Sequence, residues 1–447
     1  MDLVALELID AGLQLVSPRG RLSRPSPGLA LIDGRELAVG LDAECSARIK
    51  PRRLHSRFWQ DLGTAPLARP FPSYLRTADL AHAHLKTVWD AGGGSAGEVI
   101  AAVPGTYSDD QLALFLGIAR DLEIPIGGLV DAAVAAAADR ELSPSVLHLD
   151  LHLHRAVLTE LEHGEELVRK AVHTESRVGL LVLRDTWARV IAQTFVRTTR
   201  FDPLHVASTE QVLYAQLDDY LEALVEKEST EVRMASGGRQ HAIQLDRTRI
   251  AGAADSLYKR LSSVANECVP SDDTTLLLSH RAATLPGLVD HFEEHTGLKV
   301  VVLHQAAAAS GALAHADRIR SPDSAMPFVT RLPGLDARPP GPVTVPVTPP
   351  PDGGRHLPTH LVIDGVAHRI ASEKLILGRD GVIDTEEEDR QSASVRRLAG
   401  QAVLEVETEA GLILNGDPIA GRTALAPGDR LRFGEAGSEI LVVAMAD

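Results

Sequence analysis

The chain has 447 residues, of which 44% are hydrophobic and 24% charged, a composition typical of a globular protein of about two to three domains. Its net charge of −16 repels phosphate backbones and anionic lipid, so we expect neither a nucleic-acid partner nor membrane insertion. Its two cysteines, Cys45 and Cys268, are too few for a disulfide framework and form no Cys-x-x-Cys pair. No basic leader predicts export, and no long apolar segment predicts a membrane span. We therefore expect a cytoplasmic, bacterial-type protein.

A proline-rich segment divides the chain. Nine prolines lie between Leu332 and Thr359, where almost no periodic apolar pattern remains, and this predicts an extended, semi-rigid linker. We expect a large N-terminal domain over residues 1–322, the linker over 323–358 and a small C-terminal domain over 359–447.

The first half of the large domain alternates between strand and helix signals. Ser108 is a good N-cap for one helix, and Asp131 opens an alanine-rich one. In chain order we expect strands at 4–9 and 13–16, a hairpin at 31–35, a strand at 99–103, a helix at 108–122, a strand at 126–130 and a helix from Asp131.

The second half repeats this order. We expect strands at 146–150 and 156–161, a turn at His163-Gly164, a long helical insert, a strand at 276–278, a helix at 285–295, a strand at 300–303 and a helix at 306–316. Within the insert, residues 213–225 carry an apolar stripe that is usually core, with a partner surface as the second interpretation. Two copies of one mixed α/β unit predict a ligand-binding cleft between them.

Two segments of the large domain carry a family resemblance. Residues 102–111, Ala-Val-Pro-Gly-Thr-Tyr-Ser-Asp-Asp-Gln, and residues 129–137, Leu-Val-Asp-Ala-Ala-Val-Ala-Ala-Ala, resemble segments of the actin-like ATPase superfamily in order and spacing. They are most similar to the nucleotide-binding domain of DnaK-type heat-shock chaperones. This resemblance implies a two-lobed α/β protein with a duplicated ribonuclease-H-like fold and ATP bound between the lobes.

The implied nucleotide-binding loops depart from the family. The resemblance places them at residues 10–14 (Asp-Ala-Gly-Leu-Gln), 150–155 (Asp-Leu-His-Leu-His-Arg) and 278–286 (Leu-Ser-His-Arg-Ala-Ala-Thr-Leu-Pro). Side chains replace most of the glycines, although only glycine lets the backbone approach a phosphate closely. Losing several charged hydrogen bonds at roughly 1.5–3 kcal/mol each weakens ATP binding by some 10² to 10⁵. The implied site residues are Asp10, Gly12, Asp150, His152, His154, Arg155, Ser279 and His280.

These replacements favour a pseudo-ATPase without a cofactor. The alternative is an active ATP hydrolase, in which Asp10 and Asp150 are the magnesium-facing catalytic acids, Arg155 holds a phosphate, and Mg-ATP or Mg-ADP is bound. Intact glycines would favour that alternative.

Alternating histidines near the second loop offer another interpretation. His148, Asp150, His152 and His154 alternate along one strand, a pattern with metal-binding potential. Adjacent positions on one face of a strand are too far apart for one ion to take all four. We therefore favour crowding of the former phosphate pocket and predict no metal.

The C-terminal domain has strand-like alternation without a helical period, and Asp364-Gly365 and Asn415-Gly416 predict short hairpins. Residues 377–379 (Leu-Gly-Arg), 394–397 (Ser-Val-Arg-Arg) and 412–416 (Leu-Ile-Leu-Asn-Gly) resemble motifs of forkhead-associated (FHA) domains. That resemblance implies an all-β sandwich that binds phosphothreonine peptides. The implied binding face consists of Arg379, Ser394, Arg396, Arg397 and Asn415.

One position of the FHA pattern is not kept. Residues 409–411, Glu-Ala-Gly, stand where the family has an asparagine that grips the peptide backbone. An ion pair with the acidic residues 386–389 is an alternative role for Arg379. The expected partners of this domain are therefore proteins, whether phosphorylated or not.

Taken together, these patterns predict a non-catalytic scaffold or regulatory protein. In it, a degenerate chaperone-like ATPase domain is tethered to a protein-binding FHA-like domain, and the tether raises the effective concentration of each for a shared partner. The alternative is an ATP-dependent conformational switch whose ATPase cycle controls the FHA-like domain.

Overall fold

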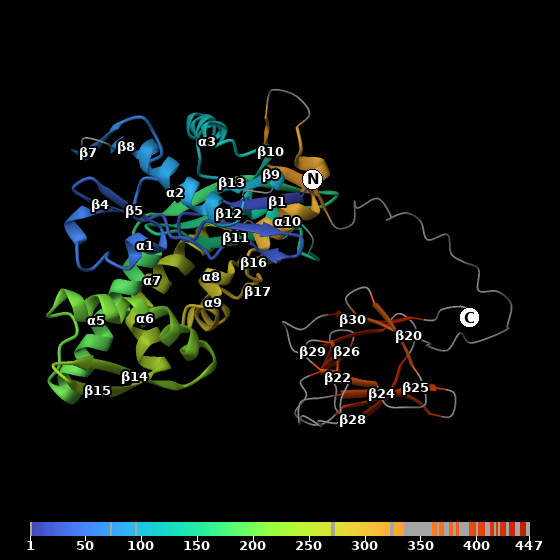
Figure 1. Cartoon of the computed structure of the whole chain (residues 1–447). Helices are drawn as coiled ribbons and strands as arrows, with labels where there is room; N and C mark the ends of the chain where they lie inside the picture. Colours follow the sequence, from blue (N-terminus) through green and yellow to red (C-terminus); the bar gives the residue numbers. More distant parts are fainter. Residues whose placement is uncertain are drawn as a thin grey trace. The chain divides into compact units, whose positions relative to one another are not determined.

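The computed structural model describes residues 2–71, 74–93, 96–138, 140–269, 273–321 and 326–334, and then the segments 360–363, 366–370, 375–378, 381–383, 393–398, 401–406, 412–414, 417–418, 421–425, 429–433 and 439–443. The chain forms two compact units, Met1–Pro340, here called the large body, and Gly341–Asp447, the C-terminal unit. The large body contains helices and several sheets, so the expected mixed α/β class is confirmed (Figure 1).

The first sheet of the large body is built around three parallel strands. β1 (Asp2–Glu7), β9 (Ala96–Val103) and β10 (Ile126–Asp131) are parallel, and β2 (Gln14–Ser17) and β3 (Gly20–Arg21) continue the sheet antiparallel on the other side of β1. β18 (Phe328–Val329) pairs with the outer edge of β10. The strand order is β18-β10-β9-β1-β2-β3.

The second sheet has the same plan. β11 (Ser145–Leu151), β16 (Thr274–Leu278) and β17 (Lys299–Val302) are parallel, whereas β12 (Ala156–His163) and β13 (Glu166–Glu175) continue antiparallel from β11. β19 (Arg331–Pro333) pairs with β13. The order is β17-β16-β11-β12-β13-β19. Residues 328–333, which the sequence prediction assigned to the linker, therefore extend the two sheets.

The strands are apolar on both faces because each sheet is covered on both sides. In β1, Leu6 belongs to an outer hydrophobic cluster and Ala5 to a central one. In β11, Leu149 belongs to a second outer cluster, whereas Val146 belongs to the same central cluster as Ala5. The central cluster contains the alanines of α4 (Ala132–Ala137) and α10 (Ala307–Ala314). These helices touch closely, since a Cβ at Gly311 would lie only 1.8 Å from the carbonyl oxygen of Ala135.

Two further helices of the first half, α2 (Thr77–Gly92) and α3 (Asp109–Asp121), pack on the first sheet through the outer cluster. Ser108 caps α3 as expected, because its hydroxyl accepts from the Gln111 N–H, and Asp131 caps α4 through Ala133 N and Val134 N. The other elements are β4 (Ala30–Asp33), β5 (Glu36–Val39), α1 (Leu41–Glu44), the 3₁₀ turn η1 (Pro51–Arg53), β6 (Leu54–His55), β7 (Pro66–Phe71) and β8 (Tyr74–Arg76).

The insert of the second half is not wholly helical. Between α6 (Ala207–Glu226) and α7 (Arg247–Cys268) lies an antiparallel hairpin of β14 (Ser229–Ser236) and β15 (Arg239–Asp246), which the sequence prediction missed. The apolar stripe of α6 is core, as expected, with Leu213, Leu217, Leu221 and Leu224 buried. The other helices of this half are α5 (Leu180–Thr199), α8 (His280–Ala283), α9 (Leu288–Thr296) and α11 (Ala316–Ile319).

The described residues of the C-terminal unit are all in strands or their immediate ends, in two antiparallel sheets that share one buried cluster, including Leu377, Leu404 and Leu431. Asp364-Gly365 and Asn415-Gly416 lie outside the described residues, but the strands on either side of each pair are antiparallel partners. One sheet contains β20 (His360–Ile363), β21 (Val366–Arg369), β26 (Leu412–Leu414), β27 (Asp417–Pro418), β29 (Arg430–Phe433) and β30 (Glu439–Val443), and the other β22 (Leu375–Gly378), β23 (Gly381–Ile383), β24 (Ala393–Leu398), β25 (Gln401–Val406) and β28 (Gly421–Ala424).

Candidate binding cleft

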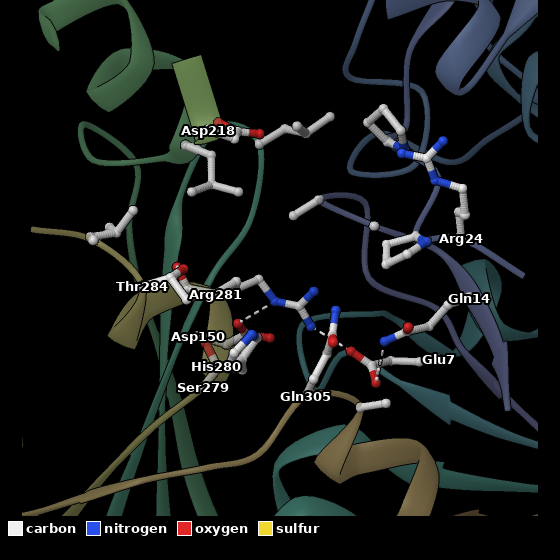
Figure 2. Close-up of a pocket in the computed structure, with 18 of the residues that line it drawn as sticks. Glu7, Gln14, Arg24, Asp150, Asp218, Ser279, His280, Arg281, Thr284 and Gln305 are labelled. Carbon is white, nitrogen blue, oxygen red and sulfur yellow. Dashed lines mark hydrogen bonds and ion pairs between the residues drawn. The ribbon is translucent and has the colours of Figure 1, made fainter. Parts of the chain in front are cut away.

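A cavity of about 810 Å³ lies in the large body where the ends of β1 and β11 approach one another. The residues that line it come from both halves of the large body, among them Glu7 and Gln14 of the first sheet and Asp150 of the second. Figure 2 shows Arg281 at the floor of this cavity, with Arg24 and Asp218 on opposite walls. We call it the central cavity.

Arg281 joins the two sheets across the floor of the central cavity. Its Nε donates to Asp150 Oδ1 at 2.8 Å, and its Nη2 donates to Glu7 Oε1 (Figure 2). Gln14 Nε2 donates to the other Glu7 oxygen at 3.2 Å. Only 22% of the Arg281 side chain is exposed, so both ion pairs are largely shielded from solvent.

This guanidinium sets the charge state of the cavity floor. Burial acts to raise the pKa of Asp150, but Arg281, with His152 and His148, outweighs it and lowers the pKa to about 2. Burial raises the pKa of Glu7, an effect that Asp150 reinforces and Arg281 only partly opposes. Asp150 is therefore a firmly ionised partner of Arg281, whereas Glu7 is held less firmly in its charged form.

Asp10 has a different partner, the imidazole of His152. His152 Nδ1 lies 3.2 Å from Asp10 Oδ1, with 3% of each side chain exposed, and the Leu153 N–H donates to the same oxygen at 3.1 Å. Burial acts to raise the pKa of Asp10, but His152 and these hydrogen bonds lower it below its usual value. The second oxygen, Oδ2, is buried and has no hydrogen-bond partner among the described residues.

The other side chains of the second loop also reach the first half of the large body. His154 Nε2 lies 2.9 Å from Ser56 Oγ, and Arg155 Nη2 donates to Thr106 Oγ1 at 2.7 Å. The side chains of the second loop therefore fasten the two halves of the large body together. Arg169 of β13 adds a further link, a 2.7 Å ion pair with the buried Asp131 at the start of α4.

The predicted site residues separate into two groups. Gly12, Asp150, Ser279 and His280 line the central cavity, whereas Asp10, His152, His154 and Arg155 lie outside its lining, in contacts between the halves. Ser279 caps α8, because its hydroxyl accepts from Ala282 N, and it also bonds Asp150. The expectation that His148, Asp150, His152 and His154 alternate along one strand is wrong, because β11 ends at Leu151 and the chain turns at residues 152–155. Among the residues that the structure describes, these four do not form a metal cluster.

The sequence did not predict that Arg281 bonds Asp150, nor that Glu7 is the second carboxylate bonded to Arg281. A signal for Glu7 was present, because a lone carboxylate inside the apolar run of residues 4–9 needs a buried cation. Arg281 stood within the third loop, but its partner depended on how the two sheets approach one another.

These residues do not fit a magnesium-bound triphosphate. One oxygen of Asp10 is taken by His152 and Leu153 N, and one oxygen of Asp150 by Arg281 and the N–H of Leu151 at 2.8 Å. The guanidinium of Arg281 holds Asp150 and ties it to Glu7, so it already occupies the place beside Asp150 where a metal ion would have to bind. The unpartnered Oδ2 of Asp10 is the one feature of this acid that favours a further ligand.

In the C-terminal unit, Ser394, Arg396 and Arg397 lie on β24, and Ser394 is half-buried. Arg379 and Asn415 lie outside the described residues, as do the acidic residues 386–389 and residues 409–411.

No protein-family model matches this sequence, and no curated protein matches it either. Within the described ranges, no helix combines the length and the apolarity that crossing a bilayer requires. The functional interpretation therefore depends on the geometry of the chain itself.

Proposed function

We propose that the protein is a non-catalytic scaffold, in which an actin-like, heat-shock-chaperone-like body without ATPase chemistry is tethered to an FHA-like, protein-binding domain. Support for the two-lobed, duplicated ribonuclease-H-like fold comes from the equal strand order of the two sheets, three parallel strands followed by two antiparallel ones. The central alanine-rich pair α4 and α10 packs between these sheets.

The bridge of Arg281 between Glu7 and Asp150 carries this proposal. A nucleotide phosphate in the same place would have to displace the guanidinium from two buried carboxylates, or bind beside them. Removing one partner of a buried ion pair costs about 3–5 kcal/mol, which corresponds to a loss of affinity of more than about a hundredfold. Nucleotide binding is therefore opposed by charge as well as by the missing glycines.

Contacts between the two halves favour a rigid body over a moving one. An ATP-driven switch works by changing the approach of its lobes, whereas here Arg281, His152, His154 and Arg155 each bond a residue of the other half. Opening would leave several of these buried polar groups without partners, at a cost of about 1–3 kcal/mol for each. A fixed shape suits a protein-binding surface.

The C-terminal unit supplies the second binding function of the proposal. Of the residues that the FHA resemblance implies, Ser394, Arg396 and Arg397 lie on the described strand β24, and guanidinium groups suit phosphate as well as carboxylate partners. A phosphothreonine peptide library and its unphosphorylated counterpart, both applied to the full chain, distinguish the two classes of protein partner.

Isothermal titration of the full chain with magnesium-ATP and magnesium-ADP tests the proposal. We expect no heat of binding at millimolar nucleotide, in the wild type or in Asp150→Ala. Protein partners retained on the full chain should then be the same with and without nucleotide. Micromolar binding that disappears in Asp150→Ala, or magnesium-dependent hydrolysis that disappears in Asp10→Asn, would refute it.

An ATP-dependent switch is the second candidate, and two observations favour it. The central cavity, at about 810 Å³, is large enough for a nucleotide, and Arg21 and Arg24 on its wall offer positive charge. The same titration decides between the candidates, because a switch requires nucleotide binding and a scaffold does not.

A further inference from the structure

A second group of reactive side chains lies outside the central cavity, on the face of the second sheet that α7 covers. It consists of Glu160 of β12, His173 of β13 and Cys268, the last residue of α7. One ligand atom from each of these residues lies within 4.8 Å of the other two. No other group of three such ligands is found among the described residues.

Strand register explains how the sheet brings two of them together. His173 pairs directly with Leu158, and Glu160 lies two residues further along β12, so Glu160 and His173 are diagonal neighbours on one face. Leu158 belongs to the same buried cluster as Ala265 and Cys268 of α7, which places the end of α7 over this face. The three residues come from three different elements that the core holds in fixed positions.

The chemistry of the group suits a divalent metal ion. His173 Nε2 lies 2.6 Å from Glu160 Oε1, and Cys268 is 8% exposed. A thiol, an imidazole and a carboxylate are ligand types that a divalent ion such as zinc takes, and a bound cation would stabilise the Cys268 thiolate.

We propose that Glu160, His173 and Cys268 form a Zn²⁺-binding site. Zinc accepts thiolate, imidazole and carboxylate ligands in tetrahedral geometry, and three protein ligands leave the fourth position to a water molecule. On binding, the Cys268 thiol gives up its proton to solvent, neutral His173 offers Nε2 and Glu160 offers a carboxylate oxygen. Because 40% of the His173 side chain is exposed, the ion has a route from solvent.

The position of the site gives it a structural consequence. Cys268 ends α7, and the chain then enters β16, whose end leads to Ser279 and Arg281. A zinc ion here would fasten the end of the insert to the middle of the second sheet. We therefore expect zinc to raise the unfolding temperature of the large body.

Cobalt titration of the metal-free full chain tests the site, because Co²⁺ takes the same ligands and its bands are visible. One equivalent of Co²⁺ should produce the visible bands of tetrahedral cobalt and a thiolate-to-cobalt charge-transfer band, and Zn²⁺ should displace both. The charge-transfer band should be absent in Cys268→Ser. It should be unchanged in the control Cys45→Ser, which replaces the other cysteine of the chain, an exposed one. His173→Ala should lower the affinity for Co²⁺ by more than roughly 10–100-fold, which is the loss expected when only an outer-shell partner of a metal ligand is removed.

Three outcomes would overturn the site. They are the absence of cobalt bands in the wild type, a charge-transfer band that survives in Cys268→Ser, and unchanged Co²⁺ affinity in His173→Ala. Circular dichroism checks the fold of each variant, and because His173 and Glu160 are only partly buried, His173→Ala and Glu160→Gln keep the test decisive if Cys268→Ser fails to fold.

Discussion

Arg281 is the residue on which the charge balance of the central cavity depends. Arg281→Ala leaves the carboxylates of Glu7 and Asp150 buried and without their shared cation. We expect a loss of about 3 kcal/mol in the free energy of unfolding, at the low end of the range for a broken buried pair because 22% of the side chain is exposed. Urea denaturation followed by tryptophan fluorescence measures it, since Trp59, Trp89 and Trp187 all lie in the large body.

Two further variants make this measurement specific. Arg281→Lys should fall between the wild type and Arg281→Ala, because an ammonium cannot reproduce the fork between two carboxylates. Arg331→Ala removes an exposed arginine that pairs with Glu166, and it should change the urea midpoint little. Equal midpoints for Arg281→Ala and Arg331→Ala would show that the buried bridge contributes no stability.

The lowered pKa of Asp150 predicts a dependence of stability on pH. A carboxylate whose pKa is depressed in the folded state stabilises the fold above its unfolded value, 3.8, and that stabilisation disappears as pH falls through the folded value of about 2. The contribution is about 2 kcal/mol at neutral pH. We expect the difference in free energy of unfolding between wild type and Asp150→Asn to shrink as pH falls from about 4 to about 2.

The pKa of Glu7 shifts in the opposite direction, so its contribution to the pH dependence of stability must be the same in both proteins that are compared. Its raised pKa gives stability that is present below its unfolded value, 4.5, and is lost as pH rises through the folded value. Because Glu7 is present in both proteins, most of its effect cancels in the comparison. A difference between wild type and Asp150→Asn that stays constant over the acid range would contradict the assigned role of Asp150.

At the residue scale, the sequence did not predict what the expected site residues bind. Asp10 stood out as a retained acid, and His152, His154 and Arg155 as replacements in the second loop; each is in a contact between the halves. Their partners Ser56 and Thr106 carry no signal, because an isolated serine or threonine is typical of any loop. Such pairings depend on the approach of two sheets, which no local pattern encodes.

At the element scale, most strands and helices of the large body follow from apolar periodicity and caps, but the β14–β15 hairpin was missed. The signal was present, since Val232 and Met234 alternate with polar residues on one strand and Ile243 and Leu245 on the next. Between them Gly237 and Gly238 have φ values of 57° and 73°, the left-handed conformation that a two-residue hairpin turn requires. The flanking helical periods obscured this short alternation.

The apolar stripe of α6 allows a test of its assignment to the core. Leu217 is fully buried, whereas Val212 on the same helix is 45% exposed. We expect Leu217→Ala to lower the free energy of unfolding by about 2–5 kcal/mol, because it removes buried methyl groups and leaves a cavity. Val212→Ala should have little effect on the urea midpoint, and similar midpoints for both variants would favour the alternative that the stripe is a partner surface.

At the scale of the whole molecule, the sequence indicated the mixed α/β class and the repeated order of elements, but not how firmly the repeats are joined. Repeated order follows from local patterns that occur twice along the chain. Joining depends on Arg281 and on the loop of residues 150–155, whose side chains bond the first half. Residues 150–155 and Arg281 thus supply the contacts that oppose movement of the two halves.

The end of the large body gives a prediction about the whole chain. β18 pairs with β10 and β19 with β13, and Leu332 of β19 is buried in the central cluster beside Leu167. A fragment of residues 1–340 keeps both strands, whereas a fragment of residues 1–322, the boundary expected from the sequence, lacks them. Loss of the Leu332 side chain alone costs about 2–5 kcal/mol of stability, so the shorter fragment should unfold at a clearly lower urea concentration.

Tryptophan fluorescence compares these fragments with the full chain, because all three tryptophans are present in each. Fragment 1–340 should match the full chain, since each unit has hydrophobic clusters built from its own described residues. Equal midpoints for fragments 1–322 and 1–340 would mean that β18 and β19 add nothing to the two sheets. A midpoint for fragment 1–340 below that of the full chain would mean that the C-terminal unit stabilises the large body, and the two units would then not be independent modules on a tether.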